Sequence, residues 1–293
     1  MNYFKLLCST AVLISATLLT QAVAAEAPKL SPGKLNLVAG DYSVEFSEDG
    51  CWTMNWLKYK GLALLETSGA NQTVIKVKPK DGVPEKNEWI GTKHGGEVIE
   101  SLALEVDGKI YPFEEPLQAP AGTSYKFIKV ARYGPVRGHW TVAVDASGVT
   151  QTAKFEQVED ISSINYAYAF MHCWNPSMTD WRAILKNGSM VGEKFPQERT
   201  QSLKEDITAL AVYSETEGVG AVVTYPKAYA GVANRKNFLN YWPKRHNKHY
   251  LCVTPANLVR ETYTCTIRAF QAPGEGWVEK ARELIDGATV TAK

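Results

Sequence analysis

Hydrophobic and polar residues alternate along most of the chain in short runs, which are separated by turns rich in glycine and aspartate. Alternation with a period of two is typical of strands that bury one face. The runs that predict strands are Lys34–Val38, Tyr42–Phe46, Cys51–Leu57, Leu62–Leu65, Thr73–Val77, Glu97–Val106, Lys109–Tyr111, Tyr125–Ala131, Gly138–Val144, Gly148–Phe155, Ser163–Trp174, Thr208–Tyr213, Val219–Tyr225, His249–Thr254 and Glu261–Phe270. Short strands joined by tight turns favour an antiparallel meander.

Three other segments complete this pattern. Asp107-Gly108 stands between two alternating runs, which is a strong signal for a hairpin turn. Gly276–Ile285 has apolar residues at helical spacing, whereas residues 175–206 carry few strand signals and are expected to form a loop excursion. The predicted fold class is therefore all-β: one large two-sheet antiparallel β-sandwich with a C-terminal helix.

The first residues have the pattern of an export signal. A lysine precedes an apolar run from Leu6 to Leu19, and small residues follow as far as Ala25. We expect residues 1–25 to be a signal peptide that is cleaved near Ala24 or Ala25, and residues 26–293 to be a single domain. The mature protein is then periplasmic or secreted, with no membrane association after removal of the signal.

Composition narrows the classes of partner. The formal net charge of +1 gives no electrostatic basis for binding nucleic acid. Aromatic residues make up 11% of the chain, and several of the eight tryptophans, such as Trp56 and Trp89, stand beside polar residues, as is common at binding surfaces. No phosphate-binding glycine loop, nucleophile elbow or His-Glu-x-x-His helix is found, so no cofactor and no metal are expected.

Four cysteines follow the signal segment: Cys51, Cys173, Cys252 and Cys265. An exported protein can oxidise them, and four cysteines allow three pairings. Cys252 and Cys265 lie on successive strand-like runs and could face each other across a hairpin, but the sequence does not choose among the pairings.

The run Ser163–Trp174 is the richest candidate for chemistry. Strict alternation places Asn165, Ala167, Ala169, Met171 and Cys173 on one face, and Tyr166, Tyr168, Phe170, His172 and Trp174 on the other. Such an aromatic face suits a groove that stacks on sugar rings. His172 is then the candidate base, with Tyr166 and Tyr168 as acids. A strand in the sandwich core explains the same residues equally well.

Three further groups are candidates for the site. His94 and Glu97 flank two glycines and could form an orienting pair for catalysis, although a polar turn accounts for them as well. Arg132, Arg137 and His139 share a short loop that could bind the carboxylate of a uronic acid. The candidate sugar subsites are Trp242, Lys248 and Tyr250 on one side, and Trp174, Trp181 and Arg182 on the opposite wall.

The stretches Tyr42–Gly50, Tyr59–Gly61, Lys93–Glu97 and Leu104–Gly108 resemble the galactose-mutarotase-like sandwich. That fold is shared by aldose 1-epimerases and by domains of polysaccharide lyases and glycoside hydrolases. The resemblance extends diffusely over about residues 34–270 and concerns the fold only. The chain lacks the epimerases' arginine-containing loop and their His-x-Tyr-Phe-Asn stretch, to which Met171–Trp174 is the nearest counterpart.

These observations lead to one hypothesis and two alternatives. The hypothesis is a secreted carbohydrate-active enzyme that acts on a sugar or acidic glycan by His/Tyr proton transfer, in the manner of an epimerase or a polysaccharide lyase. The first alternative is a non-catalytic glycan-binding β-sandwich of the cell envelope. The second is a structural or assembly protein of the envelope. Convergence of the candidate side chains in one hollow would favour the enzyme.

Overall fold

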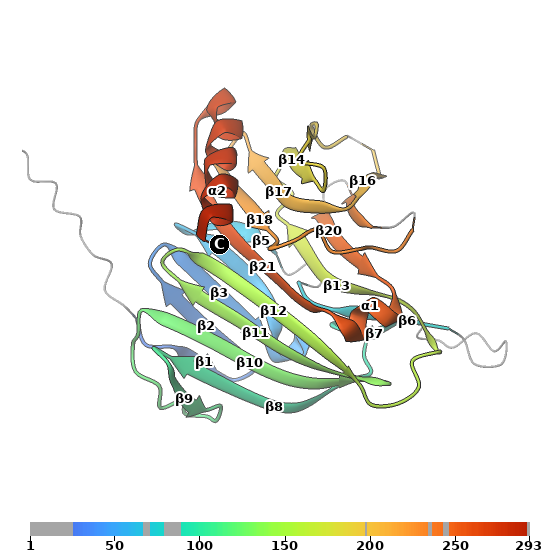
Figure 1. The fold of residues 1–293 in the computed structure, drawn as a ribbon. Coiled ribbons are helices and arrows are strands. Elements are labelled where there is room, and N and C mark those ends of the chain that lie inside the picture. Colours follow the sequence, from blue (N-terminus) through green and yellow to red (C-terminus); the bar gives the residue numbers. More distant parts are fainter. Residues whose placement is uncertain are drawn as a thin grey trace, which may run out of the picture.

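The computed structural model describes residues 26–66, 71–78, 89–196, 198–233, 236–242 and 246–291, with the backbone alone at 242, 246 and 289–291. The predicted signal peptide lies outside the described residues. Within them, strands form two antiparallel sheets that face each other, which confirms the predicted sandwich (Figure 1). Strands from early and late parts of the chain are neighbours in both sheets.

Sheet A has 11 strands, with β1-β2-β3-β4-β5-β13-β20-β19-β16 as its main path, and β6 and β7 attached through β13. Its strands are β1 (Lys29–Ser31), β2 (Lys34–Ala39), β3 (Tyr42–Ser47), β4 (Thr53–Tyr59), β5 (Leu62–Leu65), β6 (Val74–Val77), β7 (Trp89–Gly91), β13 (Ile164–Trp174), β16 (Thr200–Glu205), β19 (Asn237–Trp242) and β20 (His246–Val253).

Sheet B has 10 strands in the order β15-β14-β17-β18-β21-β12-β11-β10-β8-β9. Its strands are β8 (Glu97–Val106), β9 (Lys109–Pro112), β10 (Ser124–Tyr133), β11 (Val136–Asp145), β12 (Gly148–Gln157), β14 (Asp180–Leu185), β15 (Met190–Val191), β17 (Ile207–Ser214), β18 (Val219–Thr224) and β21 (Thr262–Gln271). Val106 pairs with Lys109, so the predicted hairpin at Asp107-Gly108 is confirmed.

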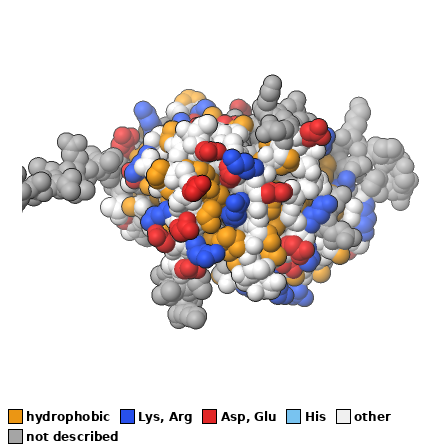
Figure 2. Space-filling model, turned by 90° about the horizontal axis from the view of Figure 1, so that it is seen from above, with side chains coloured by type: hydrophobic (Ala, Val, Ile, Leu, Met, Phe, Trp, Pro, Cys, Tyr) orange, Lys and Arg blue, Asp and Glu red, His pale blue; other side chains and the backbone are white. Residues whose placement is uncertain are grey.

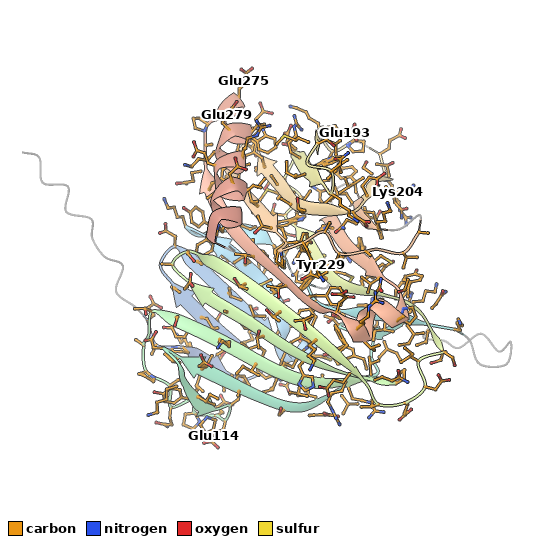
Figure 3. All side chains as sticks on the ribbon, viewed as in Figure 1. Glu114, Glu193, Lys204, Tyr229, Glu275 and Glu279 are labelled. Carbon is orange, nitrogen blue, oxygen red and sulfur yellow. The ribbon has the colours of Figure 1, made fainter. Side chains whose placement is uncertain are left out.

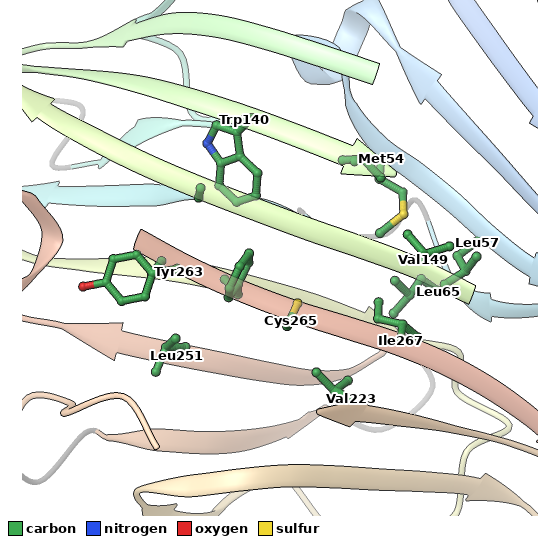
Figure 4. Packing of buried hydrophobic residues seen from close by; sticks show 14 of the residues in the cluster. Met54, Leu57, Leu65, Trp140, Val149, Val223, Leu251, Tyr263, Cys265 and Ile267 are labelled. Atoms are coloured by element: carbon green, nitrogen blue, oxygen red, sulfur yellow. The ribbon is translucent and has the colours of Figure 1, made fainter. Parts of the chain in front are cut away.

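The core fills the space between the two sheets. Residues of β4, β12, β18, β20 and β21 meet there, and Figure 4 shows Cys265 beside Ile267 and Tyr263 in this layer. Cys252 belongs to sheet A and Cys265 to sheet B, with a helix between them along the chain. The possible contact of these two cysteines across a hairpin is therefore not found, and no disulfide joins the four described cysteines.

The described part of the chain has two α-helices, one between β20 and β21 and one after the last strand. Helix α1 (Pro255–Arg260) was not predicted; Thr254 caps it by accepting a hydrogen bond from the Asn257 backbone nitrogen. The predicted C-terminal helix is confirmed as α2 (Trp277–Thr291), whose apolar side packs on the outside of β17, β18 and β21. Glu275 and Glu279 project from the outer end of this helix region (Figure 3).

The segment 175–206 is not the loop that we expected. It contributes β14 and β15 to one edge of sheet B and β16 to the far edge of sheet A. These strands are short: β15 has only two residues and β14 and β16 have six each, and β16 is mainly polar, so a local pattern marks them only weakly. The chain therefore uses this segment to extend both sheets.

The surface is mixed in charge. Seen from above, basic and acidic side chains are interspersed over the face of the molecule (Figure 2), as the net charge of +1 leads one to expect. No helix in the described part of the chain is long and apolar enough to cross a bilayer.

Candidate functional site

A β-bulge at Ala169 divides the aromatic face that was predicted for β13. Tyr168 pairs with Cys252 of β20, but Phe170 pairs with the very next residue, Leu251, so Ala169 is an extra residue on β13. A bulge of one residue reverses which side of the strand each later residue faces. Tyr166 and Tyr168 therefore point out of the sandwich, whereas Phe170, His172 and Trp174 point into its core.

His172 is consequently not a group that a substrate can reach. Its side chain is completely buried, and its Nε2 atom lies 2.9 Å from Oε1 of Gln151. Burial lowers the pKa of His172 to about 3, so the ring is neutral at ordinary pH. Its role is that of a core residue, stacked against Phe170 and against the equally buried His249.

The outward residues of β13 belong to an aromatic cluster on the outer face of sheet A. We call it the outer aromatic patch, and its members are Trp89, Tyr166, Tyr168, Phe238 and Tyr250. Trp89 stacks on Tyr168 with 5.3 Å between ring centroids and 23° between planes. Tyr168 also contacts Tyr250 at 4.7 Å, and Tyr250 stacks on Phe238 at 4.6 Å. The three tyrosines are each 8% exposed, whereas Trp89 is half-buried and offers more surface.

Basic residues lie beside the patch. His94 packs on Trp89 with 6.0 Å between ring centroids, and the Lys76 ammonium lies 5.1 Å from the centre of the Trp89 ring. Partial burial, and then the charge of Lys248, lower the pKa of His94. Burial likewise lowers the pKa of Lys93, with Lys248 contributing to the shift. Lys248 and Tyr250 share the outer face of β20 while His249 points inward, as the alternation predicts.

The tyrosines of the patch are poorly suited to proton transfer. Burial, followed by the nearby Tyr166, raises the pKa of Tyr168 far above its usual value. Burial also raises the pKa of Tyr250. Their hydroxyls therefore stay protonated and act as hydrogen-bonding groups, because a catalytic acid or base works best with a pKa near the operating pH.

The predicted pair of His94 and Glu97 does not form. The Glu97 carboxylate turns into the sandwich, where it lies 2.7 Å from the Lys129 ammonium and accepts a hydrogen bond of 2.7 Å from the Tyr133 hydroxyl. Lys129 also donates to Oε1 of Gln72 and to the backbone oxygen of Cys51. Glu97 is thus one half of a buried structural ion pair.

Arg132, Arg137 and His139 lie on the outer side of sheet B and are already paired with carboxylates. Arg137 lies 2.6 Å from the Glu100 carboxylate, which contacts both its Nε and Nη2 atoms. Arg132 pairs with Glu159 at 2.5 Å, and His139 lies 3.3 Å from Glu156. The expected short loop is wrong, because Arg132 stands on β10 and Arg137 and His139 stand on β11. The carboxylates balance the charge of both arginines, which removes the reason for placing a uronic acid there.

The expected second wall of the groove is also part of the interior. Trp174 is completely buried and Trp181 is 4% exposed, and both belong to the main core. The Arg182 guanidinium lies over the Trp277 ring of α2 at 5.4 Å. The side chain of Trp242 lies outside the described residues.

The structure adds Trp89 to the candidate site. The sequence carried a usable signal, because Trp89 follows the charged residue Glu88 and so has a polar neighbour. Its approach to Tyr168 depends on the pairing of β6 with both β7 and β13, which no local pattern reveals. No cluster of three or more metal-ligating side chains is found among the residues whose positions are described.

Comparison with known proteins bears on the fold alone. No protein-family model and no curated protein sequence matches the chain. The α-N-acetylgalactosaminidase NagBb from Bifidobacterium bifidum, in complex with GalNAc, is similar in structure at 7% identity and a TM-score of 0.53, over 86% of this chain and 38% of that one. The GH36 α-galactosidase AgaB from Geobacillus stearothermophilus is similar at 10% identity and a TM-score of 0.48, over 85% and 41%.

A galactose mutarotase-like protein from Clostridium acetobutylicum also matches, at 9% identity and a TM-score of 0.47, over 83% of this chain and 98% of that one. The resemblance expected from the sequence concerns the fold, and the solved structures that match this chain include this galactose mutarotase-like protein and a putative aldose 1-epimerase from Escherichia coli. The chain spans about two fifths of the length of the two glycosidases.

Proposed function

We propose that the protein binds a carbohydrate at the outer aromatic patch without converting it chemically. The observation that carries the proposal is the half-buried Trp89 ring, which is held by stacking on Tyr168 and bordered by His94 and Lys76. A fixed aromatic ring beside hydrogen-bonding groups suits a sugar, whose C–H face is apolar and whose edge is polar. The similar folds of glycosidases, one of them holding GalNAc, agree with a carbohydrate-related role.

The neighbouring cations support an acidic sugar as the preferred ligand. The positive charge of Lys248 acts on both Lys93 and His94, since it contributes to the lowered pKa of each. Cations placed close together repel one another, and a bound anion relieves this repulsion. A carboxylate on the glycan would therefore strengthen binding at this edge of the patch.

Binding is favoured over catalysis because the acid and base that the enzyme hypothesis needs are separated. His172 is enclosed in the core, while Tyr166 and Tyr168 lie on the opposite face of β13. Enzyme geometry needs such partners within hydrogen-bond reach or one water apart. We further propose that the protein is exported, which N-terminal sequencing of the mature chain from cell fractions would test.

The test measures glycan binding by calorimetry with acidic and neutral polysaccharides. Trp89→Ala should weaken binding at least tenfold, about 1.4 kcal/mol, since it removes the stacking platform. Trp56→Ala is the matched control, because Trp56 is also half-buried on sheet A and contacts a lysine but lies outside the patch. Equal binding by both variants would reject the site. Accelerated mutarotation of a fresh sugar, or release of unsaturated uronate, would reject the non-catalytic assignment.

A further inference from the structure

A cleft lies between α2 and the outer face of sheet B, on the side of the molecule opposite the outer aromatic patch. Its volume is about 310 Å³, at the lower end of the range of about 300–1,000 Å³ for small-molecule sites. The strands β17, β18 and β21 form its floor, and α2 forms one wall. Its lining includes Thr208, Thr224, Thr264, Thr266, Arg268 and Ile285.

The floor of this cleft is polar because of the alternation along β21. Tyr263, Cys265 and Ile267 are buried in the core, so the residues between and after them, Thr264, Thr266 and Arg268, face outward. Thr266 pairs across the strands with Thr224, which places a hydroxyl from β18 beside it. The cleft thus has a row of threonine hydroxyls with one guanidinium at its end.

Arg268 supplies the charge of the cleft. Its guanidinium makes no hydrogen bond and no ion pair with any side chain in the described ranges, in contrast to Arg132 and Arg137, which are both paired. The Arg268 residue is nevertheless only partly exposed. A partly desolvated guanidinium with free donors is well suited to bind a carboxylate through two parallel hydrogen bonds.

The threonine hydroxyls retain hydrogen-bonding capacity. Thr150 and Thr266 share one hydrogen bond of 3.0 Å between their hydroxyls, and Thr152 and Thr264 share one of 3.3 Å. Each hydroxyl carries one donor and two acceptor sites, so each pair keeps one donor hydrogen and several acceptor sites. Groups that both donate and accept are complementary to the hydroxyls of a sugar.

The wall of the cleft is apolar. Ile285 and Ala288 of α2, together with Pro226, face the polar floor across the open space. A ligand that fits therefore has one anionic group, several hydroxyls and an apolar C–H surface. A simple inorganic anion lacks the last two, and a neutral sugar lacks the first.

We propose that this cleft is a second binding site, for a sugar acid of monosaccharide or disaccharide size. Its residues do not overlap with those of the outer aromatic patch, and the two sites lie on the outer faces of different sheets. The proposal rests on the proposed carbohydrate-binding function only in that both assume a protein that encounters carbohydrates. Each site can therefore be tested without the other.

The experiment is calorimetric titration of the full mature protein with D-glucuronate, with D-glucose and inorganic sulfate as comparison ligands. Arg268→Met keeps much of the side-chain stem but removes the charge, and it should weaken glucuronate binding at least tenfold. Arg268→Lys should recover part of the lost affinity, since it restores the positive charge but not the planar guanidinium that makes two parallel hydrogen bonds. Arg260→Met is the matched control, because Arg260 is exposed on α1 and does not line the cleft.

A second variant keeps the test decisive if the arginine variants fold poorly. Thr266→Val preserves the shape of the side chain and removes its hydroxyl, and it should weaken glucuronate binding severalfold. The proposal is overturned if Arg268→Met binds glucuronate like the wild type, or if glucose or sulfate binds as tightly as glucuronate. Trp89→Ala should leave glucuronate binding at the cleft unchanged, so failure of the patch and failure of the cleft give different results.

Discussion

The carboxylate of Glu97 lies 2.7 Å from the ammonium nitrogen of Lys129, and their side chains are 0% and 1% exposed. The two residues stand on the paired strands β8 and β10 of sheet B. Because a buried charge without a partner is costly, each of these residues depends on the other. The pair also explains why Glu97, which follows an exposed glycine turn, is not available at the surface.

Lys129→Ala is expected to lower the free energy of unfolding by about 3–5 kcal/mol, the cost of leaving one charge of a buried pair without its partner. Lys126→Ala provides the control on the same strand. Lys126 pairs with Glu105 at 2.8 Å, but the side chains are 39% and 21% exposed, so the expected loss is at most about 1 kcal/mol. Urea unfolding measures both. Similar losses in the two variants would contradict the structural role of the buried pair.

Stability is expected to fall as the pH drops from about 6.5 toward 3. An unfolded histidine has a pKa of about 6.5, and burial lowers that of folded His172 to about 3. Between these values the unfolded chain binds more protons than the folded one, so stability is complete above the unfolded pKa and is lost on acidification. Such a group contributes up to about 1.4 kcal/mol per pH unit.

Unfolding measured at pH 7.5 and pH 5.0 tests this dependence. His172→Gln should reduce the difference between the two values, because it removes a titrating ring while keeping a side chain that can bond Gln151. Cys265→Ala is the control: it alters the same buried surroundings but leaves both core histidines, so the pH difference should remain. An unchanged pH difference in His172→Gln would refute the argument.

The four described cysteines should remain reduced, without disulfides, and should differ in reactivity. Cys51 is half-buried, whereas Cys173, Cys252 and Cys265 are buried. Burial, and then Glu97, raise the pKa of Cys51, so even this thiol should react more slowly than a free cysteine. Mass spectrometry after iodoacetamide treatment should show Cys51 modified first in the native protein. All four should react in denaturant without a reductant; Cys51→Ser should abolish the early modification.

Trp277 is one of the residues through which helix α2 packs on sheet B. Its ring stacks on Tyr213 with 5.1 Å between centroids and 4° between planes. Trp277→Ala should lower the free energy of unfolding by about 3 kcal/mol, as for other large aromatic deletions. Asp286→Ala, on the exposed side of the same helix, should change it by no more than about 0.5 kcal/mol. Equal effects would show that the stacking does not anchor the helix.

The strand pattern of the sequence predicted the sandwich, because apolar and polar residues alternate along a long strand that buries one face. It also predicted the hairpin at Asp107 and the helix over Gly276–Ile285. It missed β14, β15 and β16, which have six, two and six residues. Their place in the sheets depends on pairing with β17 and β19, which a local pattern does not reveal.

The candidate site was harder to predict for the same reason. The periodicity of β13 identified Tyr166 and Tyr168, but the extra residue Ala169 becomes visible only when β20 is aligned beside it. Likewise, Glu97 has its partner 32 residues away on another strand, while His94 is its near neighbour in the chain. Contacts across strands, and not the order of residues, decided which side chains met.

The bulge at Ala169 also determines what a deletion in β13 would do to the packing of the sandwich. Loss of Ala169 alone would make the pairing of β13 with β20 regular, and Phe170, His172 and Trp174 would then turn to the outer face of sheet A while Met171 and Cys173 entered the core. Such a deletion would exchange three large rings for two smaller side chains in the interior. A single added residue thus allows one strand to contribute aromatic rings to the packed interior and to the outer surface.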